Sequence, residues 1–245
     1  MNKEQGHSTM EGDFLCPHPL DNAQYKILEG QYCRLEVLNC KTNENVVEEL
    51  FNCFKSNENV HFQYLKYGPF ETIDEFKDLI YKNEQANSKT VMYTIFVKEQ
   101  PMGFICFARI QCDQGTIAIS GINFSQQLVR TREATESIYL LLTFAFDTLG
   151  YRRVEWRCNA LNVKSRQSAK RFGFQYEGTW LKATISKGEI RDDAWHSIID
   201  DEWILLKQEY QQWLNPINFD HNGQQLSKLN AAQINPRKQF SDKSV

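Results

Sequence analysis

The stretch that decides the fold reads GYRRVEWRCNALNVKS and runs from Gly150 to Ser165. Between Arg153 and Ala160 every second residue is apolar, which predicts a β-strand with one buried face. A short helix is expected directly afterwards, at Val163–Phe172, because Asn162 is a suitable N-cap and Gly173 a suitable stop. A strand that leads at once into a helix is typical of an α/β domain.

The surrounding sequence predicts further strands and helices in alternation. The strongest helix is expected at Thr135–Leu149, because its apolar residues recur three and four positions apart. Other helices are expected at Thr42–Ser56, from Thr72 to about Asn83, and from Asp200 to Leu214. Strands are expected at Tyr25–Leu28, Tyr32–Leu38, Val91–Lys98, Met102–Ile110, Thr116–Phe124, Phe174–Ile185 and Ala194–Ile199, with a tight hairpin at Glu99–Pro101. The fold class is therefore α/β: a mixed, mostly antiparallel sheet flanked by helices, with one strand–helix–strand crossover.

Length, composition and charge exclude several classes of protein. With 245 residues, of which 41% are hydrophobic and 24% charged, the chain is not disordered, collagen-like or a coiled coil. The net charge of −3 offers no excess of positive charge for binding nucleic acid. No apolar run reaches the ~20 residues that span a bilayer, and the N-terminus lacks a secretory pattern. We therefore expect a cytoplasmic protein that binds neither nucleic acid nor membrane.

The cysteines and the two ends of the chain complete this outline. Seven cysteines are present and no two are spaced Cys-x-x-Cys, so neither a disulfide framework nor a metal site is expected. The ends are polar and interrupted by prolines, which predicts a flexible N-terminal arm at 1–24, one domain at 25–214 and a C-terminal tail at 215–245. Solvated tails are the simpler interpretation; contacts in a homodimer or over the active site are the alternative.

A candidate anion site lies in the segment Val129–Glu136, which joins a predicted strand to the strongest helix. The start of a helix leaves several backbone N–H groups unpaired and carries partial positive charge. Arg130 and Arg132 would add two cations. The segment therefore predicts that an anion binds here, with an ordinary exposed turn as the alternative.

The strand that ends at Asn162, the Asn-x-x-Ser spacing to Ser165, and the pair Gly173-Phe174 resemble the GCN5-related N-acetyltransferases. Glu177-Gly178 and the run Arg191–Ser197 are similar to the branch of ribosomal-protein alanine N-acetyltransferases. The resemblance covers about residues 27–214 and extends to the order of the elements. It implies an acyl-CoA N-acyltransferase fold. It also implies transfer of an acetyl group from acetyl-CoA to a primary amine of a small molecule or of a protein N-terminus.

The resemblance also implies which residues bind acetyl-CoA. The CoA pyrophosphate is expected against the loop before the long helix, formed by Arg130, Thr131, Arg132, Glu133, Ala134 and Thr135. The pantetheine arm is expected along Gly121–Phe124, which includes Ile122 and Phe124, and against Asn162. Ser165 is expected near the thiolate leaving group as its acid.

The sequence departs from the family pattern at three places. Arg132 stands where the family loop has a glycine, and close approach of the backbone to phosphate is harder without one. The strand Thr116–Phe124 contains no acid, with Ala118 at the relevant place, and Thr184 replaces the glutamate of the ribosomal-protein branch. The general base is therefore sought elsewhere. The candidates are Asp192, Glu177, Glu155, His196 and a chain of water molecules, and we select Asp192 because it precedes a strand near the expected substrate face.

The missing acids leave a second function open. A catalytically degenerate relative would keep the fold and bind acyl-CoA without transferring the acyl group. A group of aromatic residues between the first two helices would either shape the acceptor pocket or pack under a loop: Phe62, Tyr64, Tyr67 and Phe70.

Overall fold

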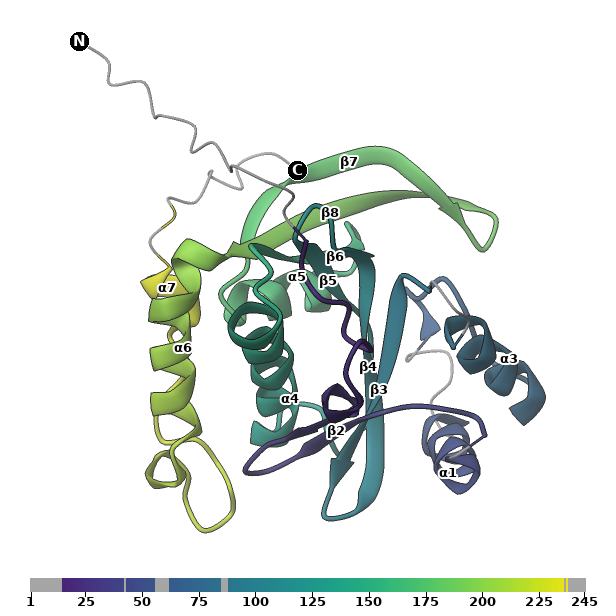
Figure 1. Cartoon of the computed structure of the whole chain (residues 1–245), viewed down its shortest axis with the longest axis horizontal. Coiled ribbons are helices and arrows are strands. Elements are labelled where there is room, and N and C mark those ends of the chain that lie inside the picture. Colours follow the sequence, from purple (N-terminus) through teal and green to yellow (C-terminus); the bar gives the residue numbers. More distant parts are fainter. Residues whose placement is uncertain (1–14, 42, 56–61, 85–87, 236, 238–245) are drawn as a thin grey trace.

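The computed structural model describes residues 15–41, 43–55, 62–84, 88–235 and 237. One sheet of eight strands crosses the described part of the chain in the order β1-β2-β3-β4-β5-β6-β8-β7 (Figure 1). The strands are β1 (Ile27–Glu29), β2 (Arg34–Val37), β3 (Thr90–Val97), β4 (Gln100–Gln111), β5 (Thr116–Phe124), β6 (Arg153–Asn159), β7 (Gln175–Ser186) and β8 (Glu189–Ile199). All neighbouring strands are antiparallel except β5 and β6, which the α4 crossover makes parallel. The predicted fold class and its crossover are confirmed.

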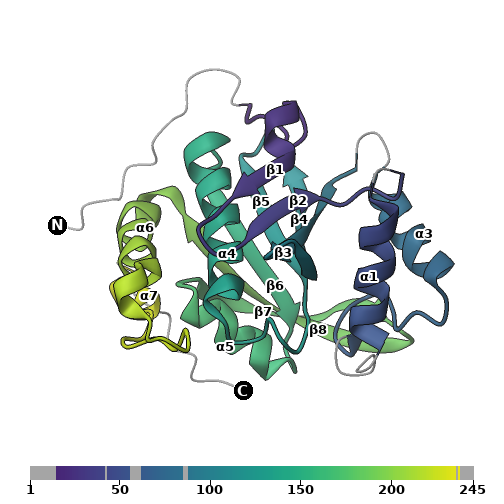
Figure 2. The same ribbon diagram turned by 90° about the horizontal axis from the view of Figure 1, so that it is seen from below.

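Helices lie on both faces of this sheet (Figure 2). The α-helices are α1 (Glu44–Lys55), α3 (Ile73–Asn83), α4 (Arg132–Thr143), α5 (Val163–Arg171), α6 (Asp200–Leu214) and α7 (Ala231–Ile234). A π-helical turn, η2 (Phe144–Thr148), continues α4, and two short 3-10 helices are η1 (Ala23–Lys26) and η3 (Pro216–Asn218). The expected helix at Thr135–Leu149 is therefore α-helical only as far as Thr143.

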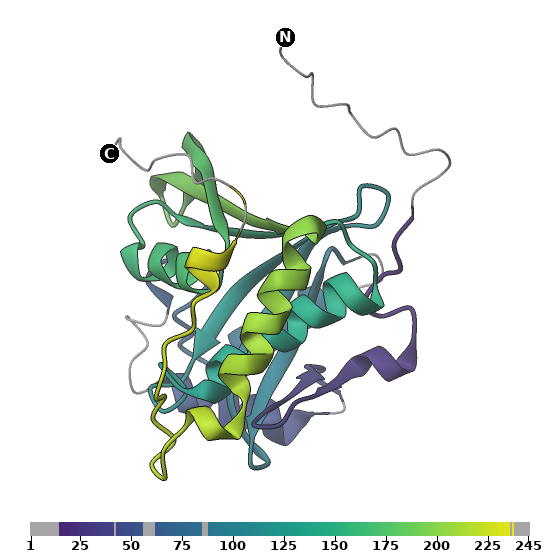
Figure 3. The same cartoon turned by 90° about the vertical axis from the view of Figure 1, so that its left-hand side faces the viewer.

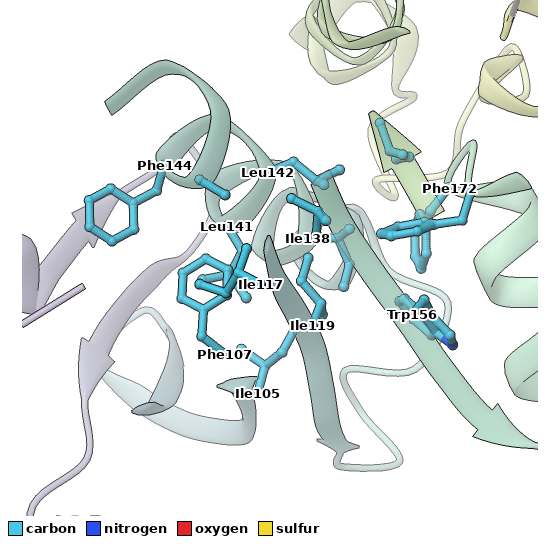
Figure 4. Packing of buried hydrophobic residues seen from close by; sticks show 14 of the residues in the cluster. Ile105, Phe107, Ile117, Ile119, Ile138, Leu141, Leu142, Phe144, Trp156 and Phe172 are labelled. Atoms are coloured by element: carbon cyan, nitrogen blue, oxygen red, sulfur yellow. The ribbon is translucent and has the colours of Figure 1, made fainter. Parts of the chain in front are cut away.

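Two hydrophobic cores fill the spaces between sheet and helices because side chains alternate along each strand. The larger core joins α4 to β4 and β5 through Ile105, Phe107, Ile117, Ile119, Ile138, Leu141 and Leu142 (Figure 4). The smaller core joins α1 and α3 to β3 and β4 through Leu50, Phe54, Phe76, Met92, Phe104 and Cys106. Along β4, alternate residues thus serve opposite cores, which holds both helical layers to one sheet.

The long β7–β8 hairpin extends over the α1–α3 side of the molecule (Figure 1). Near its tip, Lys187 Nζ donates a hydrogen bond to the backbone oxygen of Phe62 at 2.8 Å. Arg191 donates to the backbone oxygen of Tyr64 at 3.0 Å. The hairpin therefore holds the described residues just before α3, from Phe62 onward, where the sequence has its group of aromatic residues.

The described parts of both chain ends lie against the body. Cys16 N donates to the backbone oxygen of Cys112 at 2.9 Å, and the Tyr151 hydroxyl donates to that of Pro17 at 3.2 Å. The C-terminal segment runs back along α6 to α7 (Figure 3), where Asn235 Nδ2 donates to the backbone oxygen of Gly173 at 3.0 Å. The division at 1–24, 25–214 and 215–245 stays a prediction, but residues 15–24 and 215–235 have structural contacts within this chain.

Three predicted boundaries were wrong. The hairpin between β3 and β4 turns at Lys98 and Glu99, which both have positive φ, so Gln100 and Pro101 belong to β4. Helix α4 begins at Arg132 rather than Thr135, because the Thr131 hydroxyl accepts the N–H of Ala134 at 3.1 Å and caps the helix earlier. Strand β8 begins at Glu189 rather than Ala194, because its pairing with β7 continues to the hairpin tip.

The carboxylate of Glu136 joins α4 to the opposite edge of the sheet. Its Oε1 accepts the N–H of Gln31 at 2.7 Å, and its Oε2 accepts the N–H groups of Tyr32 and Cys33 at 2.7 Å each. The residue is only 3% exposed. A side chain at Gly30 would come within 2.6 Å of this carboxylate, so the turn between β1 and β2 closes tightly around it. Hydrogen bonds to an ionised group are stronger than neutral ones.

We expect Glu136→Gln to destabilise the protein by about 1–3 kcal/mol, because an amide cannot accept all three N–H groups and places a donor against donors. Urea unfolding followed by circular dichroism would measure the change. Glu48→Gln, on the exposed face of α1, is the matched control. Equal unfolding free energies for Glu136→Gln and wild type would show that the buried carboxylate does not stabilise the turn.

Candidate functional site

The central feature of the site is the separation of β5 from β6. The two strands are paired over four residues each, from Thr116 opposite Arg153 to Ile119 opposite Trp156, and then separate (Figure 4). Beyond that point β5 continues along β4 to Phe124, and β6 continues along β8 to Asn159. The edge of β5 that faces β6 is therefore left without a partner strand over its last residues, and an extended ligand can use those backbone groups.

A bulge marks the start of the open edge. Gly121 has a φ of +58°, and a Cβ there would lie 2.8 Å from Cys106 Sγ and 3.0 Å from the Tyr67 hydroxyl oxygen. Both the positive φ and the lack of space require glycine. The Tyr67 hydroxyl is buried and has no hydrogen-bond partner within the described residues. Burial raises the pKa of Tyr67 well above its ordinary value, so the group is a protonated donor beside the bulge.

The N-terminus of α4 lies beyond the end of β5. The Thr131 hydroxyl accepts the N–H of Ala134 and donates to the backbone oxygen of Leu128 at 2.8 Å. The backbone N–H groups of Arg132 and Glu133 make no hydrogen bond to any described residue. Two donors at the positive end of a helix are therefore free for an anion. Arg130 is exposed and adopts a φ of +66° in the preceding turn.

Arg132 is held beside this helix end. Its Nε donates to Glu133 Oε1 at 3.1 Å. Its guanidinium carbon lies 4.3 Å from the centre of the Tyr32 ring and 5.4 Å from that of Phe219. The cation is thus held against the β1–β2 turn and the C-terminal segment, at the helix end that has the two free N–H groups.

A further cation near α4 has no signal in the local sequence. Arg171, in the last turn of α5, donates to the Thr135 hydroxyl oxygen at 3.1 Å. Its guanidinium carbon also lies 5.3 Å from the Trp213 ring. Burial lowers the pKa of Arg171. It ties α5 to the first turns of α4, on the buried side of the candidate site.

Asn162 and Ser165 lie together where α5 begins. The Asn162 side chain accepts the N–H of Ser165 at 3.0 Å, so it is the N-cap that the sequence predicts. The Ser165 hydroxyl oxygen accepts the indole N–H of Trp156 at 3.0 Å. Because Trp156 is the last residue of β6 that pairs with β5, this hydroxyl lies at the point where the strands part. As an acceptor from Trp156 it keeps one O–H to donate, and the Cys158 side chain is a hydrogen-bonding neighbour of that O–H.

Asp192 does not join this group. It lies within β8, where its Oδ1 accepts the N–H of Lys182 at 2.6 Å. It is not paired with its neighbour Arg191, whose Nε instead contacts Asp193 Oδ1 at 2.6 Å. The structure gives no contact between Asp192 and Ser165 among the described side chains, and the role of Asp192 as a base stays a prediction.

The other base candidates have structural partners. Glu155 pairs with Arg153 at 3.0 Å, and Glu177 contacts Arg153 and, at 2.8 Å, Arg237. His196 is buried, with its ring 5.4 Å from that of Tyr176. Burial alone would raise the pKa of Glu177, but hydrogen bonds from Arg153 and Ser197 lower it to about 2.

All seven cysteines are free thiols. In the part of the chain that the structure describes, no three His, Cys, Asp or Glu side chains are grouped so that they could hold a metal ion. Within the same ranges, no helix combines the length and the apolar character needed to cross a membrane.

The chain is similar to several known proteins. A sequence model described as an acetyltransferase (GNAT) domain matches residues 41–175. A crystal structure of a GCN5-related N-acetyltransferase from Brucella melitensis is 37% identical with a TM-score of 0.80, covering 89% of this chain and 96% of that one. An uncharacterised N-acetyltransferase of Bacillus subtilis, YnaD, is 23% identical over 150 residues, which are 61% of this chain and 86% of the relative.

The fold is also shared with an acetyltransferase of Salmonella typhimurium that modifies the N-terminal serine of ribosomal protein L7/L12. That structure is 21% identical with a TM-score of 0.62, and the match covers 71% of this chain and 98% of that one. At this identity the likeness concerns the arrangement of the elements.

The ion pairs of Glu177 predict a pH dependence of stability. Its pKa is about 2 in the folded protein against an ordinary 4.5, so its stabilisation is complete above pH 4.5 and is lost as the pH falls from 4.5 towards 2. The difference in unfolding free energy between wild type and Glu177→Gln should shrink over that interval in urea titrations. Glu189→Gln, on the same hairpin, reports the effect of removing one exposed carboxylate. A difference that stays constant down to pH 2 would contradict the assignment.

Proposed function

The chain belongs to the GCN5-related N-acetyltransferase family, and from this premise we propose that it transfers the acetyl group of acetyl-CoA directly to a primary amine. The observation that carries the proposal is the open edge of β5, which begins after Ile119 and ends beside the N-terminus of α4. A long carrier with an extended arm and a diphosphate needs both features in this order.

The residues present fit such a carrier. Gly121 lets β5 bulge against Cys106 and Tyr67 where its pairing with β6 has ended, so an arm can approach a backbone that has no partner strand. The free N–H groups of Arg132 and Glu133, with the guanidinium groups of Arg130 and Arg132, would hold the diphosphate. Thr131, Ala134 and Thr135 shape this helix end, and Ile122, Phe124 and Asn162 would flank the arm. Bound acetyl-CoA supplies an activated thioester.

The chain's own side chains would then stabilise charge and move protons. We assign to Ser165 the donation of its hydroxyl proton towards the leaving sulfur, supported by its place beside the parting of the strands. The backbone N–H groups of the open β5 edge are the proposed donors to the oxygen that gains negative charge. Asp192 is the proposed base that removes a proton from the amine.

A second function, binding of acyl-CoA without catalysis, is favoured by one specific observation. The buried or half-buried carboxylates on β6, β7 and β8 are neutralised by arginines: Glu155 by Arg153, Glu177 by Arg153 and Arg237, and Asp193 by Arg157 and Arg191. For Glu177 the pairing lowers the pKa of the carboxyl to about 2, which makes this group a weak base. Release of free thiol from acetyl-CoA over a panel of amines and N-terminal peptides distinguishes the two functions, because a binder would show a thermal shift with acetyl-CoA but no amine-dependent release.

We expect Arg132→Glu to weaken acetyl-CoA binding by about tenfold or more, because it reverses the charge next to the two free N–H groups. Isothermal titration calorimetry measures the affinity. Arg152→Glu makes the same reversal at the opposite end of the crossover, on an exposed side chain, and should leave the affinity unchanged. Wild-type affinity in Arg132→Glu would place the diphosphate elsewhere.

We expect Ser165→Ala to lower kcat by about tenfold to a hundredfold while KM for acetyl-CoA changes little, because the hydroxyl acts on the leaving group rather than on the bound carrier. Steady-state thiol release gives both constants. Ser168→Ala, one turn further along α5, where the half-buried hydroxyl donates to the backbone oxygen of Lys164, is the control. A normal kcat in Ser165→Ala would remove the serine from the reaction.

A further inference from the structure

Apart from the open edge of β5, a hollow lies on the face of the sheet that carries α1 and α3. It has a volume of about 260 Å³ and is lined by residues of β4, β6, β7 and β8. Glu155 in its floor pairs with Ala118 of β5, and Ala118 pairs in turn with Ala108 of β4. The hollow therefore begins one strand away from the residue at which the family places an acid. We refer to it as the Arg109 hollow.

A bulge in β4 directs one basic side chain to this hollow. Arg109 has a φ of +52°, and the pairing of β4 with β5 shifts register next to it. Its guanidinium carbon lies 5.0 Å from the centre of the Trp195 ring, which Trp180 covers at 4.5 Å. Non-glycine residues with positive φ cost conformational energy and persist where the surrounding structure maintains them. The strained backbone thus presents a cation against an aromatic wall.

Arg109 is a basic group with unused hydrogen-bonding capacity. Among the residues that the structure describes, its ionic contact is to Glu155 at 3.6 Å, which is too long for a hydrogen bond, and its side chain is 46% exposed. The carboxylates nearby are already paired at shorter distances, Glu155 with Arg153 at 3.0 Å and Asp193 with Arg191 at 2.6 Å. A carboxylate from a ligand would therefore meet an unsatisfied guanidinium.

The excess of basic side chains and the unpaired hydrogen-bond donor around the hollow both favour binding of an anion. Within the described residues, six basic side chains gather around four carboxylates: Lys66, Arg109, Arg153, Arg157, Arg191 and Arg237 against Glu155, Glu177, Asp193 and Glu202. Burial, and then the charges of Arg157 and Arg191, lower the pKa of Lys66. The indole N–H of Trp195 is buried without a partner in the described ranges. A local excess of cations and donors in a chain of net charge −3 is a binding feature.

We propose that the Arg109 hollow binds the carboxylate of the acceptor, so that the enzyme acetylates a small primary amine that also carries a carboxylate. Its volume lies below the ~300–1,000 Å³ typical of sites for larger ligands, which suits an amino acid or one acidic side chain near a peptide N-terminus. The inference rests on the proposed function, since it names the class of amine.

The proposal that the hollow binds the acceptor's carboxylate is tested by measuring release of free thiol from acetyl-CoA with matched pairs of amines. The probes are the common amino acids with their carboxamides, and serine-initiated tripeptides with aspartate or asparagine in second place. In one of the two series, kcat/KM for the carboxylate should be about ten- to a hundredfold higher than kcat/KM for the matching neutral amide. A hydrogen bond to a charged group accounts for a difference of this size. The first series indicates a free amino acid as substrate and the second a peptide.

Arg109→Gln should abolish this preference while activity on the neutral member persists, and Trp195→Phe should reduce it. Arg34→Gln is the control, since Arg34 also stacks on an aromatic ring and pairs with glutamates but lies on β2. Equal kcat/KM values for acid and amide, or a preference that survives in Arg109→Gln, overturn the proposal.

Binding without turnover separates this inference from the proposed function. Titration of the protein with each carboxylate probe, followed by tryptophan fluorescence, should show saturation that Arg109→Gln loses. Saturation without thiol release would refute acetyl transfer and keep the anion site. Thiol release that does not distinguish acid from amide would keep the transferase and refute the anion site. No saturation by any carboxylate probe overturns the inference.

Discussion

The structure depends on the short length over which two parallel strands are paired. Had β5 and β6 stayed together beyond Ile119 and Trp156, the sheet would be continuous and the backbone of β5 would have no free edge. Instead each strand follows its other neighbour, β4 or β8. The glycine bulge at position 121 turns β5 at the place where the pairing ends. The opening is thus built by backbone hydrogen bonds on both sides and does not rely on loops.

The cation and amide cluster at the end of this opening is fixed by contacts across the molecule. Helix α4 is held to the sheet by the large core and to the β1–β2 turn by the three N–H groups that Glu136 accepts. The same turn supplies Tyr32, on which Arg132 stacks. A buried carboxylate one turn inside the helix therefore positions the aromatic ring that positions the proposed phosphate-binding cation.

The local sequence patterns were sufficient for the fold and for some of the local structure around the candidate site. Alternating residues in β6, the cap at Asn162 and the apolar spacing of α4 each act over a few residues, so the sequence shows them directly. The start of α4 was misjudged because Thr131 caps it through a side-chain hydrogen bond that apolar spacing does not reveal. Local patterns could not identify the roles of Glu136, Arg171 and Arg109. Their partners lie far along the chain, and the neighbouring sequence contains no pattern that predicts these contacts. Asp192 was chosen from its place before a strand, yet the extended β7–β8 hairpin includes it and ties its carboxylate to Lys182.

Backbone hydrogen exchange, measured with and without acetyl-CoA, tests most directly whether the open edge of β5 and the start of α4 hold one carrier. Slower exchange of the amides at 120–124 and at 130–135 in the same titration, with little change along β1 to β3, is the result that the account predicts. Unchanged exchange in both segments at saturating acetyl-CoA, or protection confined to another part of the sheet, would contradict it.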